Sequence, residues 1–197
     1  MLPLTRSDLM SLEEYAAQRA GFRSKVLTHK KNRQVAVGSN ATLYFEDRLT
    51  IQYQIQEMLR IERIFEPQAI EEELTAYNPL IPDGNNWKAT FMLEFTDVDQ
   101  RRAALASMTN IEDKVWVQIK DQEQVYAVAD EDLERGNEEK TSAVHFLRFE
   151  LSPKMIEALR NGNGSSGITI GIAHPTYNKQ IELNEATRTA LIQDLIT

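Results

Sequence analysis

The chain has 197 residues and a formal net charge of −8, with 22 basic and 30 acidic side chains and no cysteine. The missing thiols exclude disulfides, zinc–thiolate sites, cysteine-bound iron–sulfur clusters and cysteine nucleophiles. The acidic balance argues against general nucleic-acid binding, because contacts between basic side chains and phosphate dominate that affinity. The length fits one domain, 1–197, with a sizeable hydrophobic core.

The N-terminus and the hydropathy pattern favour a cytoplasmic protein. Met1–Asp8 lacks the apolar segment and the small-residue cleavage site of a secretory signal peptide. No apolar run approaches the roughly 20 residues that span a bilayer. We therefore expect a cytoplasmic protein with no membrane and no nucleic-acid partner. The oligomeric state is not determined by the sequence.

The first elements predicted along the chain are two helices and a hairpin. Thr5 or Ser7 can cap a first helix, and Gly21 is a candidate for its end. Phe22–Lys31 is predicted to form a second, basic helix. Alternating apolar residues on both sides of a Gly-Ser-Asn turn predict a short hairpin over Gln34–Phe45.

The segment Asp47–Phe65 is predicted to form a long helix with one carboxylate inside its apolar stripe. At 100° per residue, its apolar side chains share one broad face, and Glu62 falls near the middle of that face. A buried carboxylate must be paired, hydrogen-bonded or protonated. Glu62 is therefore either the ion-pair partner of an arginine from a neighbouring element or part of a functional site.

The sequence pattern changes after a break rich in proline and glycine at residues 78–84. Pro67 favours the start of one more helix before this break, which closes a helical N-terminal part of about residues 1–80. Short strands and helices follow in an α+β part of about residues 87–197. Strands are predicted at residues 91–95, 115–119, 125–128, 143–151, 168–172 and 180–183. The predicted helix caps of this part are Thr96, Ser152 and Asn184.

The predicted fold class is α+β, with the helical N-terminal part packed on a mostly antiparallel sheet. Two strand–helix segments, Glu94–Leu105 and Glu150–Leu159, resemble each other, and each leads to a further strand. A pair of such units indicates a split β-α-β core of the ferredoxin-like kind. A chance similarity of a few residues is the alternative explanation.

Charge is distributed unevenly along the chain. Residues 19–33 carry six basic side chains and no acidic one, whereas Glu71–Glu73 and the segment 121–139 are acidic. Such poles can orient a charged partner. Two solvated faces of opposite sign are the simpler explanation.

The sequence contains no metal or cofactor motif. It has no His-Glu-x-x-His, and Glu57 and Glu62 are not followed by the histidine that a carboxylate-bridged di-iron bundle needs. His145 alternates with apolar residues of its predicted strand, so it is either a hydrogen-bonded core histidine or a site residue. His174 and Tyr177 lie either at a pocket rim or in a plain turn. We therefore expect no cofactor and no metal.

One candidate pocket combines polar side chains from the long helix and the sheet. Carboxylate, guanidinium and imidazole groups that converge in an apolar setting serve acid–base chemistry or the binding of a small acid. The candidate pocket residues are Glu57, Arg60, Glu62 and His145. The weaker candidates are Arg63, Arg148, His174 and Tyr177.

Three segments carry a resemblance to a known family: Glu46–Glu66, Tyr77–Gly84 and Asn137–Phe149. In these segments, and over essentially its whole length, the chain resembles a bacterial family catalogued as a domain of unknown function. The family has no established activity, so the resemblance implies no catalytic residues. Its genes commonly neighbour those of rubrerythrin-like proteins and heterodisulfide-reductase-type iron–sulfur oxidoreductases. This implies a role in redox or oxidative-stress physiology.

The leading functional interpretation is a cytoplasmic accessory or adaptor protein that docks a rubrerythrin-like or iron–sulfur oxidoreductase partner. It rests on the charge asymmetry, the missing cofactor motifs and the gene neighbours that the resemblance implies. A chain without cysteine cannot hold the iron–sulfur centre itself, which favours a role other than catalysis. The alternative is a small-acid-binding or metal-binding protein or enzyme that uses the candidate pocket.

Overall fold

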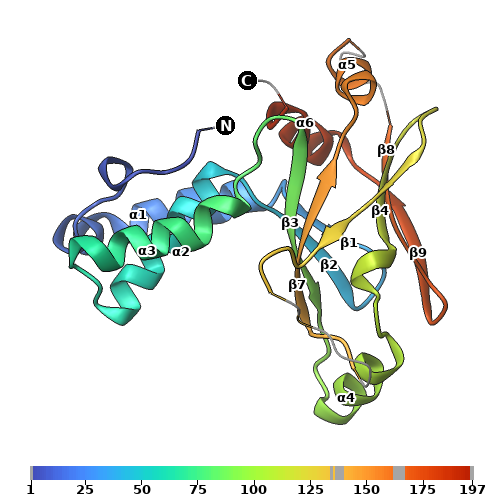
Figure 1. Cartoon of the computed structure of the whole chain (residues 1–197), viewed down its shortest axis with the longest axis horizontal. Coiled ribbons are helices and arrows are strands. Elements are labelled where there is room, and N and C mark those ends of the chain that lie inside the picture. The colour runs from blue at the N-terminus through green and yellow to red at the C-terminus, as the bar shows by residue number, and fades with distance from the viewer. Residues whose placement is uncertain (1, 134, 136–139, 162–166, 196–197) are drawn as a thin grey trace.

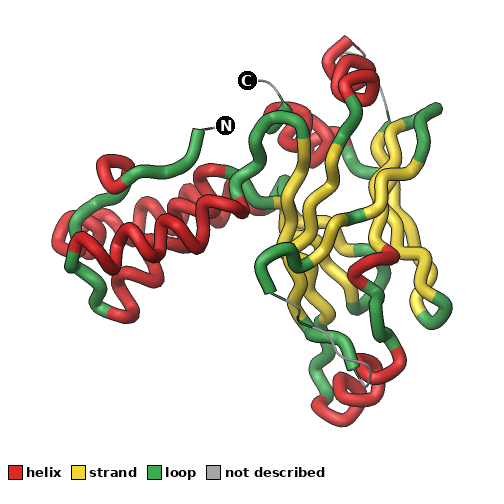
Figure 2. The backbone as a smooth tube through the Cα atoms, in the orientation of Figure 1, coloured by secondary structure: helices red, strands yellow, loops and turns green. Residues whose placement is uncertain are grey.

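The computed structural model describes residues 2–133, 135, 140–161 and 167–195. A helical lobe lies at one end of the molecule and two antiparallel sheets lie at the other (Figures 1 and 2). The predicted α+β class is confirmed, with six α-helices among the described residues. None of the described helices combines the length and apolarity needed to cross a membrane. Residues 137–139, which belong to one of the family-like segments, lie outside the described part.

One helix, α1 (Leu12–Lys30), replaces the two helices predicted before residue 32. Its N-cap, Ser11, exchanges hydrogen bonds with the first turn in a capping box. Gly21 lies inside the helix with an ordinary negative φ, so the predicted helix end at this residue is wrong. A glycine in an exposed helix costs about 1 kcal/mol, which does not end a helix whose flanking turns pack. Thr5 is the N-cap of only the short turn η1 (Arg6–Asp8).

Two further helices complete the helical lobe, which consists of α1, α2, α3 and the N-terminal segment. Helix α2 (Arg48–Glu62) begins at Asp47, whose carboxylate accepts the backbone N–H of Thr50 at 2.9 Å. Helix α3 (Pro67–Tyr77) has its proline in the first turn, as predicted, and the turn η2 (Asn78–Leu80) follows it. The small core of the lobe contains Leu4, Ile51, Ile55, Leu59, Ile70, Leu74 and Ile81.

The last turn of α2 corrects the prediction for Glu62. The helix ends at this residue, and Arg63 turns the chain away with a left-handed φ of 57°. Glu62 is exposed, and so are its apolar neighbours Ile61, at 64%, and Phe65, at 69%. The predicted apolar stripe is therefore buried at Ile51, Ile55 and Leu59 but exposed at its end.

The larger sheet has five strands in the order β1-β2-β3-β7-β6, and all of its pairs are antiparallel. Its strands are β1 (Gln34–Ala36), β2 (Ala41–Phe45), β3 (Asn86–Leu93), β7 (Val144–Glu150) and β6 (Val128–Ala129). The predicted hairpin at residues 34–45 is confirmed as β1 and β2. Gly38 in its turn has a φ of 83°, a conformation that favours glycine.

The smaller sheet has four strands in the order β5-β4-β8-β9. Its strands are β5 (Gln124–Tyr126), β4 (Val115–Ile119), β8 (Ile168–His174) and β9 (Tyr177–Glu182). The remaining helices are α4 (Val98–Ser107), η3 (Glu112–Lys114), α5 (Pro153–Asn161) and α6 (Glu185–Gln193). Asn184 caps α6 as predicted, whereas α4 is capped by Asp97 and not by Thr96. The aspartate carboxylate accepts the N–H of Gln100 at 2.7 Å.

The residues that the structure describes do not form the predicted split β-α-β core of the ferredoxin-like kind. The two strand–helix–strand units exist as β3–α4–β4 and β7–α5–β8, but each one starts in the five-stranded sheet and ends in the four-stranded sheet. A split β-α-β core needs both strands of a unit in one sheet. The similarity of the two segments thus reflects two crossovers between sheets.

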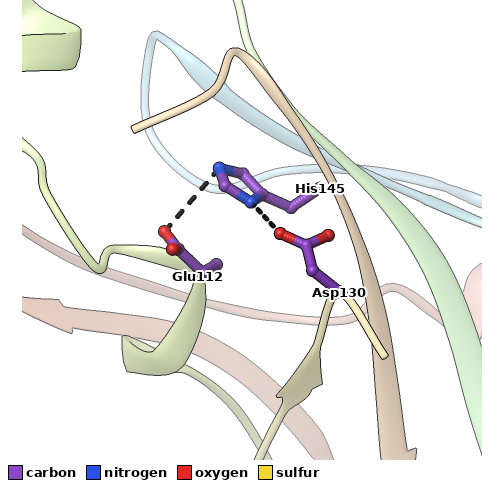
Figure 3. Close-up of side chains that lie close together, drawn as sticks. All are labelled: Glu112, Asp130 and His145. Atoms are coloured by element: carbon purple, nitrogen blue, oxygen red, sulfur yellow. Dashed lines mark hydrogen bonds and ion pairs between the residues drawn. The ribbon is translucent and has the colours of Figure 1, made fainter. Parts of the chain in front are cut away.

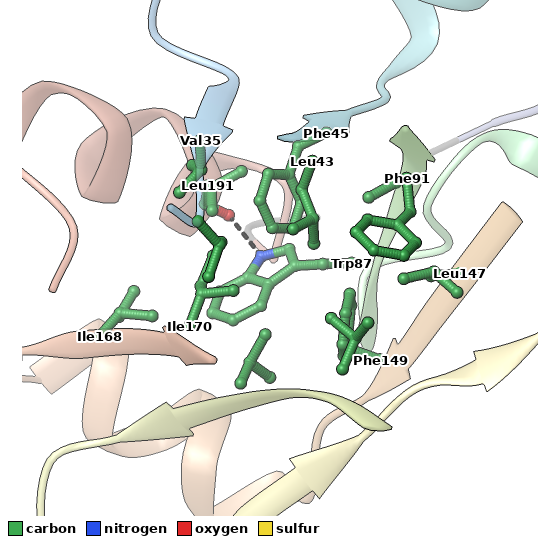
Figure 4. Packing of buried hydrophobic residues seen from close by; sticks show 14 of the residues in the cluster. Val35, Leu43, Phe45, Trp87, Phe91, Leu147, Phe149, Ile168, Ile170 and Leu191 are labelled. Carbon is green, nitrogen blue, oxygen red and sulfur yellow. Dashed lines mark hydrogen bonds between the residues drawn. The ribbon is translucent and has the colours of Figure 1, made fainter. Parts of the chain in front are cut away.

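The main hydrophobic core lies between the two sheets and is closed at one end by α6 (Figure 4). Trp87 lies at its centre, in edge contact with Phe45, and its indole N–H donates to the carbonyl of Leu191 at 2.8 Å. A Cβ on Gly171 would lie 2.2 Å from the Trp116 ring, so a side chain at that position would collide with it. Alternation in β3 directs every second residue into this core.

A buried ion-pair network joins the helical lobe, the first hairpin and the C-terminal helix. Arg33, which is 3% exposed, binds both carboxylate oxygens of Asp194 at 2.5 and 2.8 Å. Its Nε lies 3.0 Å from Oδ2 of Asp47, the N-cap of α2, and His29 Nε2 approaches the same oxygen at 2.5 Å. A single guanidinium thus connects two helix ends that lie far apart in the sequence.

We predict that Arg33→Met lowers the free energy of unfolding by about 3–5 kcal/mol, because it leaves two buried carboxylates without their cation. Urea unfolding at pH 7 measures the loss. Arg23→Met, on the exposed face of α1, is the matched control and should change stability by less than about 0.5 kcal/mol. Equal effects of the two variants would contradict the role assigned to the buried network.

Candidate functional site

Glu57, one of the predicted pocket residues, lies in an ion pair between α1 and α2. Arg19 donates from Nε and Nη2 to its two carboxylate oxygens at 2.7 and 2.8 Å, and the Tyr15 hydroxyl donates at 2.6 Å. The hydrogen-bonded Arg19 guanidinium lowers the pKa of Glu57 to about 2. Arg60, one turn further along α2, lies 3.7 Å from the same carboxylate. These two predicted residues are neighbours, but they belong to a helix–helix contact.

The other two residues of the predicted pocket lie elsewhere. Glu62 is exposed at the end of α2, and His145 is 0% exposed on β7. The prediction that His145 shares the apolar face of its strand is confirmed. That face packs toward the four-stranded sheet, whereas the helical lobe lies over the opposite face. The four residues therefore do not line one cavity.

The weaker candidates also lie in separate places. Arg63 is the exposed left-handed residue that ends α2. His174 and Tyr177 flank the turn between β8 and β9, which corresponds to the plain-turn alternative. The imidazole of His174 lies 3.1 Å from the Thr109 carbonyl, and the Tyr177 hydroxyl donates to the Val37 carbonyl at 2.8 Å. Both side chains thus hold the sheets to adjacent loops.

His145 belongs to a buried cluster with two carboxylates (Figure 3). Glu112 comes from η3, Asp130 follows β6, and His145 lies in β7. Asp130 Oδ2 is 2.6 Å from His145 Nδ1, and Glu112 Oε2 is 3.6 Å from Nε2. The three residues form the Glu112–Asp130–His145 cluster. No sequence motif links them, so only the histidine was a candidate from its strand pattern.

Further oxygen atoms surround the second ring nitrogen of His145. The Thr141 hydroxyl lies 2.8 Å from Nε2 and donates to Glu112 Oε2 at 3.0 Å. The Ser142 carbonyl lies 3.1 Å from the same nitrogen. Because Nδ1 already faces Asp130, both ring nitrogens face oxygen atoms. Either a second ring proton or a metal ion at Nε2 can satisfy this arrangement.

The cluster combines two carboxylates with basic side chains. The carboxylates of Glu112 and Asp130 are both largely buried. The guanidinium of Arg135 lies 3.2 Å from Asp130 and also pairs with the exposed Asp132. A cationic His145 imidazole or a bound metal ion can supply the second positive charge that the two buried carboxylates require.

A cleft of about 570 Å³ separates the helical lobe from the outer face of the five-stranded sheet. We call it the lobe–sheet cleft. It is lined by Glu46, Met58, Glu73, Ala76, Tyr77, Pro79, Leu80, Lys88, Ala89, Glu131, Asp132, Phe146, Leu147 and Arg148. An adjoining cavity of about 360 Å³ shares Glu46, Tyr77, Leu80 and Phe146 with it. The predicted candidate Arg148 thus lies in a cleft, but on the face of β7 opposite to His145.

The two cations of the lobe–sheet cleft are already bonded within the protein. Lys88 donates to the carbonyls of Pro79 and Ile81 at 2.6 and 3.0 Å, and burial lowers its pKa. Arg148 forms ion pairs with Glu131 at 2.8 Å and with Glu150 at 2.6 Å.

One carboxylate of the cleft is in a different situation. Burial raises the pKa of Glu73, and the nearby carboxylates of Glu62 and Glu72 add to this effect. A half-buried carboxylate with acidic neighbours interacts favourably with a cation, so Glu73 can pair with a basic group of a bound partner.

The fold and the sites define a two-sheet α+β protein with a helical lobe, an apolar cleft and a buried histidine–carboxylate cluster. The chain belongs to the family described as "Protein of unknown function (DUF3501)", whose model matches residues 3–195. The family resemblance predicted from the sequence is therefore confirmed, whereas its redox association stays a prediction.

The chain is also similar to a protein of known structure from Burkholderia pseudomallei, described as a novel protein of unknown function. The two sequences are 48% identical, the TM-score is 0.92, and the match covers 98% of this chain and 100% of the other. No curated protein shows significant similarity to the chain.

We predict that Glu57→Gln lowers the melting temperature at pH 7, because Arg19 loses its ionised partner. The depressed pKa of Glu57 means that its contribution is present above the ordinary value of 4.5 and is lost as the pH falls toward about 2. Thermal unfolding between pH 7 and pH 2 should therefore show the difference from the parent shrinking below pH 4.5. Glu62→Gln, on the same helix but exposed, should leave the melting temperature at pH 7 unchanged. A loss as large as that of Glu57→Gln would contradict its exposed position.

Proposed function

We propose that this protein is a cytoplasmic accessory protein that binds a segment of a redox partner in its lobe–sheet cleft. The expected partner is a rubrerythrin-like protein or an iron–sulfur oxidoreductase. This partner class comes from the family resemblance, and the docking mode comes from the cleft. In this role the chain contributes binding and positioning, and the partner contributes the redox centre.

The observation that carries the proposal is the size and lining of the lobe–sheet cleft. A volume of about 570 Å³ is within the range of about 300–1,000 Å³ that is usual for ligand sites. Met58, Leu80 and Phe146 give it apolar walls from α2, η2 and β7. Such a site can accept one or two large apolar side chains of a partner, which is how interface anchors bind.

The charge of the cleft supports a partner segment that also carries a basic residue. The cleft contains four carboxylates and two cations, and both cations are engaged by groups of the protein itself. Glu73 is the carboxylate best placed to receive an additional cation, because it is half-buried and has acidic neighbours. Complementary charge of this kind contributes mainly to specificity and association rate.

A small-acid site is less well supported. The predicted carboxylate–arginine–histidine pocket is not assembled. An acid in the lobe–sheet cleft would have to displace Glu131 from Arg148 or two carbonyls from Lys88. Both displacements cost existing charge-assisted hydrogen bonds.

We predict that Ala76→Trp weakens binding of the purified redox partner at least about tenfold, because Ala76 is an exposed cleft residue of α3 and the indole would fill the cleft. Binding of the full chain to the rubrerythrin-like or iron–sulfur protein of the same host is measured by calorimetry at low salt. Thr75→Trp, one residue earlier and outside the cleft, is the matched control and should bind like the parent. No binding by the parent, or equal loss in both variants, would refute docking in the cleft.

The charge argument has its own matched pair. Glu73→Lys should reduce the affinity and its salt dependence, whereas Glu72→Lys, on the exposed side of the same helix, should change both much less. Binding of a small organic acid that Ala76→Trp abolishes would instead favour the small-acid alternative in this cleft.

A further inference from the structure

The Glu112–Asp130–His145 cluster does not overlap with the residues that line the lobe–sheet cleft. It lies on the inner side of the five-stranded sheet, whereas the cleft lies on the outer side. Its members come from η3, the end of β6, and β7, so the tertiary fold alone brings them together. A buried group of three ionisable side chains is costly unless charge compensation or a bound ion stabilises it.

The hydrogen bond between Asp130 and His145 resembles the outer part of a metal site. A metal-bound histidine usually donates its second ring N–H to a carboxylate, which fixes the orientation of the ring. Asp130 Oδ2 is placed for this role at 2.6 Å from Nδ1. Asp130 is itself held in position, because its Oδ1 accepts hydrogen bonds from the backbone N–H of Phe146 at 2.9 Å and from the Arg135 guanidinium at 3.2 Å. The ring is therefore fixed with Nε2 directed at the remaining oxygen atoms.

The distances of three oxygen atoms from Nε2 are compatible with shared coordination of one ion. Glu112 Oε2, the Ser142 carbonyl and the Thr141 hydroxyl lie 3.6, 3.1 and 2.8 Å from Nε2. For bonds of about 2.1 Å to a central ion, these separations correspond to ligand–metal–ligand angles of about 85–120°. Angles of this size occur in octahedral and tetrahedral sites.

We propose that His145 and Glu112, with the Thr141 hydroxyl and the Ser142 carbonyl, bind one divalent first-row metal ion such as Mn²⁺. Asp130 is the positioning residue that orients the imidazole. The donor set has one nitrogen, several oxygens and no sulfur, which favours Mn²⁺ or Fe²⁺ over thiolate-seeking ions. In this proposal the ion takes the place of a second proton on the His145 ring and neutralises the two carboxylates. This site does not use the side chains that line the lobe–sheet cleft, although Arg135 joins Asp130 to the cleft residue Asp132.

Mn²⁺ titration of the chelator-treated full chain tests the proposal. We expect one ion per chain by calorimetry, a higher melting temperature with Mn²⁺ than without it, and a Mn²⁺ electron paramagnetic resonance signal changed by binding. Mg²⁺, which prefers to keep its waters, should stabilise the chain less. Absence of stoichiometric binding, together with NMR evidence that both ring nitrogens of His145 carry protons, would overturn the proposal in favour of a metal-free ion pair.

Matched variants separate the metal site from a structural role. Glu112→Gln keeps the side-chain shape and an acceptor for Thr141, so we expect a metal-free melting temperature close to that of the parent and Mn²⁺ affinity at least about a hundredfold lower. Its control is Asp113→Asn, exposed one residue away. Asp130→Asn should weaken binding about 10–100-fold, as loss of an orienting carboxylate does. Its control, Asp121→Asn, changes an exposed carboxylate outside this network and should bind like the parent. Equal Mn²⁺ affinity in all four variants would refute the assigned ligands.

Discussion

The buried guanidinium of Arg33 is the constraint on which the arrangement of this molecule depends. It lies directly before the first hairpin and binds the carboxylates at the start of α2 and at the end of α6. A charge this deeply buried is tolerated only when its partners are in place. The lobe, the edge of the larger sheet and the C-terminal helix therefore take one relative position. The bond from Trp87 to the Leu191 carbonyl adds a second link between α6 and the core.

Alternation along β7 divides the chemistry of the protein between two faces. His145 points inward, where the second sheet excludes water, whereas Arg148 points outward into the lobe–sheet cleft. The inner face offers fixed oxygen and nitrogen donors in a closed space, which suits a small ion. The outer face offers an open apolar cleft with charged residues, which suits a larger partner. One strand thus supports two sites, and a substitution on one face can leave the other intact.

Local signals in the sequence predicted helices and strands correctly where the signal residue acts on backbone groups within one turn of itself. The cap at Asn184, the proline that opens α3 and the Gly38 hairpin all work through neighbouring backbone groups. The errors occurred where the outcome depends on what packs nearby. Gly21 did not end its helix, because the cost of one glycine is smaller than the stability of the helical turns on both sides of it. Glu62 matched the apolar stripe by its angle around the helix but lies at the exposed end of α2.

The sequence by itself determined the exclusion of thiol chemistry, the α+β class, most of the helices and strands, and the family. These features follow from composition and from hydrophobic periodicity, and this periodicity is visible within one helix or strand without its neighbours. Only the tertiary structure decided which face each element buries, and hence the members of each site. Glu112 and Asp130 look like ordinary acidic surface residues until η3 and β6 bring them to His145. The separation of His145 from Glu57 has the same cause, because the face that a strand buries depends on long-range packing between sheets and not on the pattern within the strand.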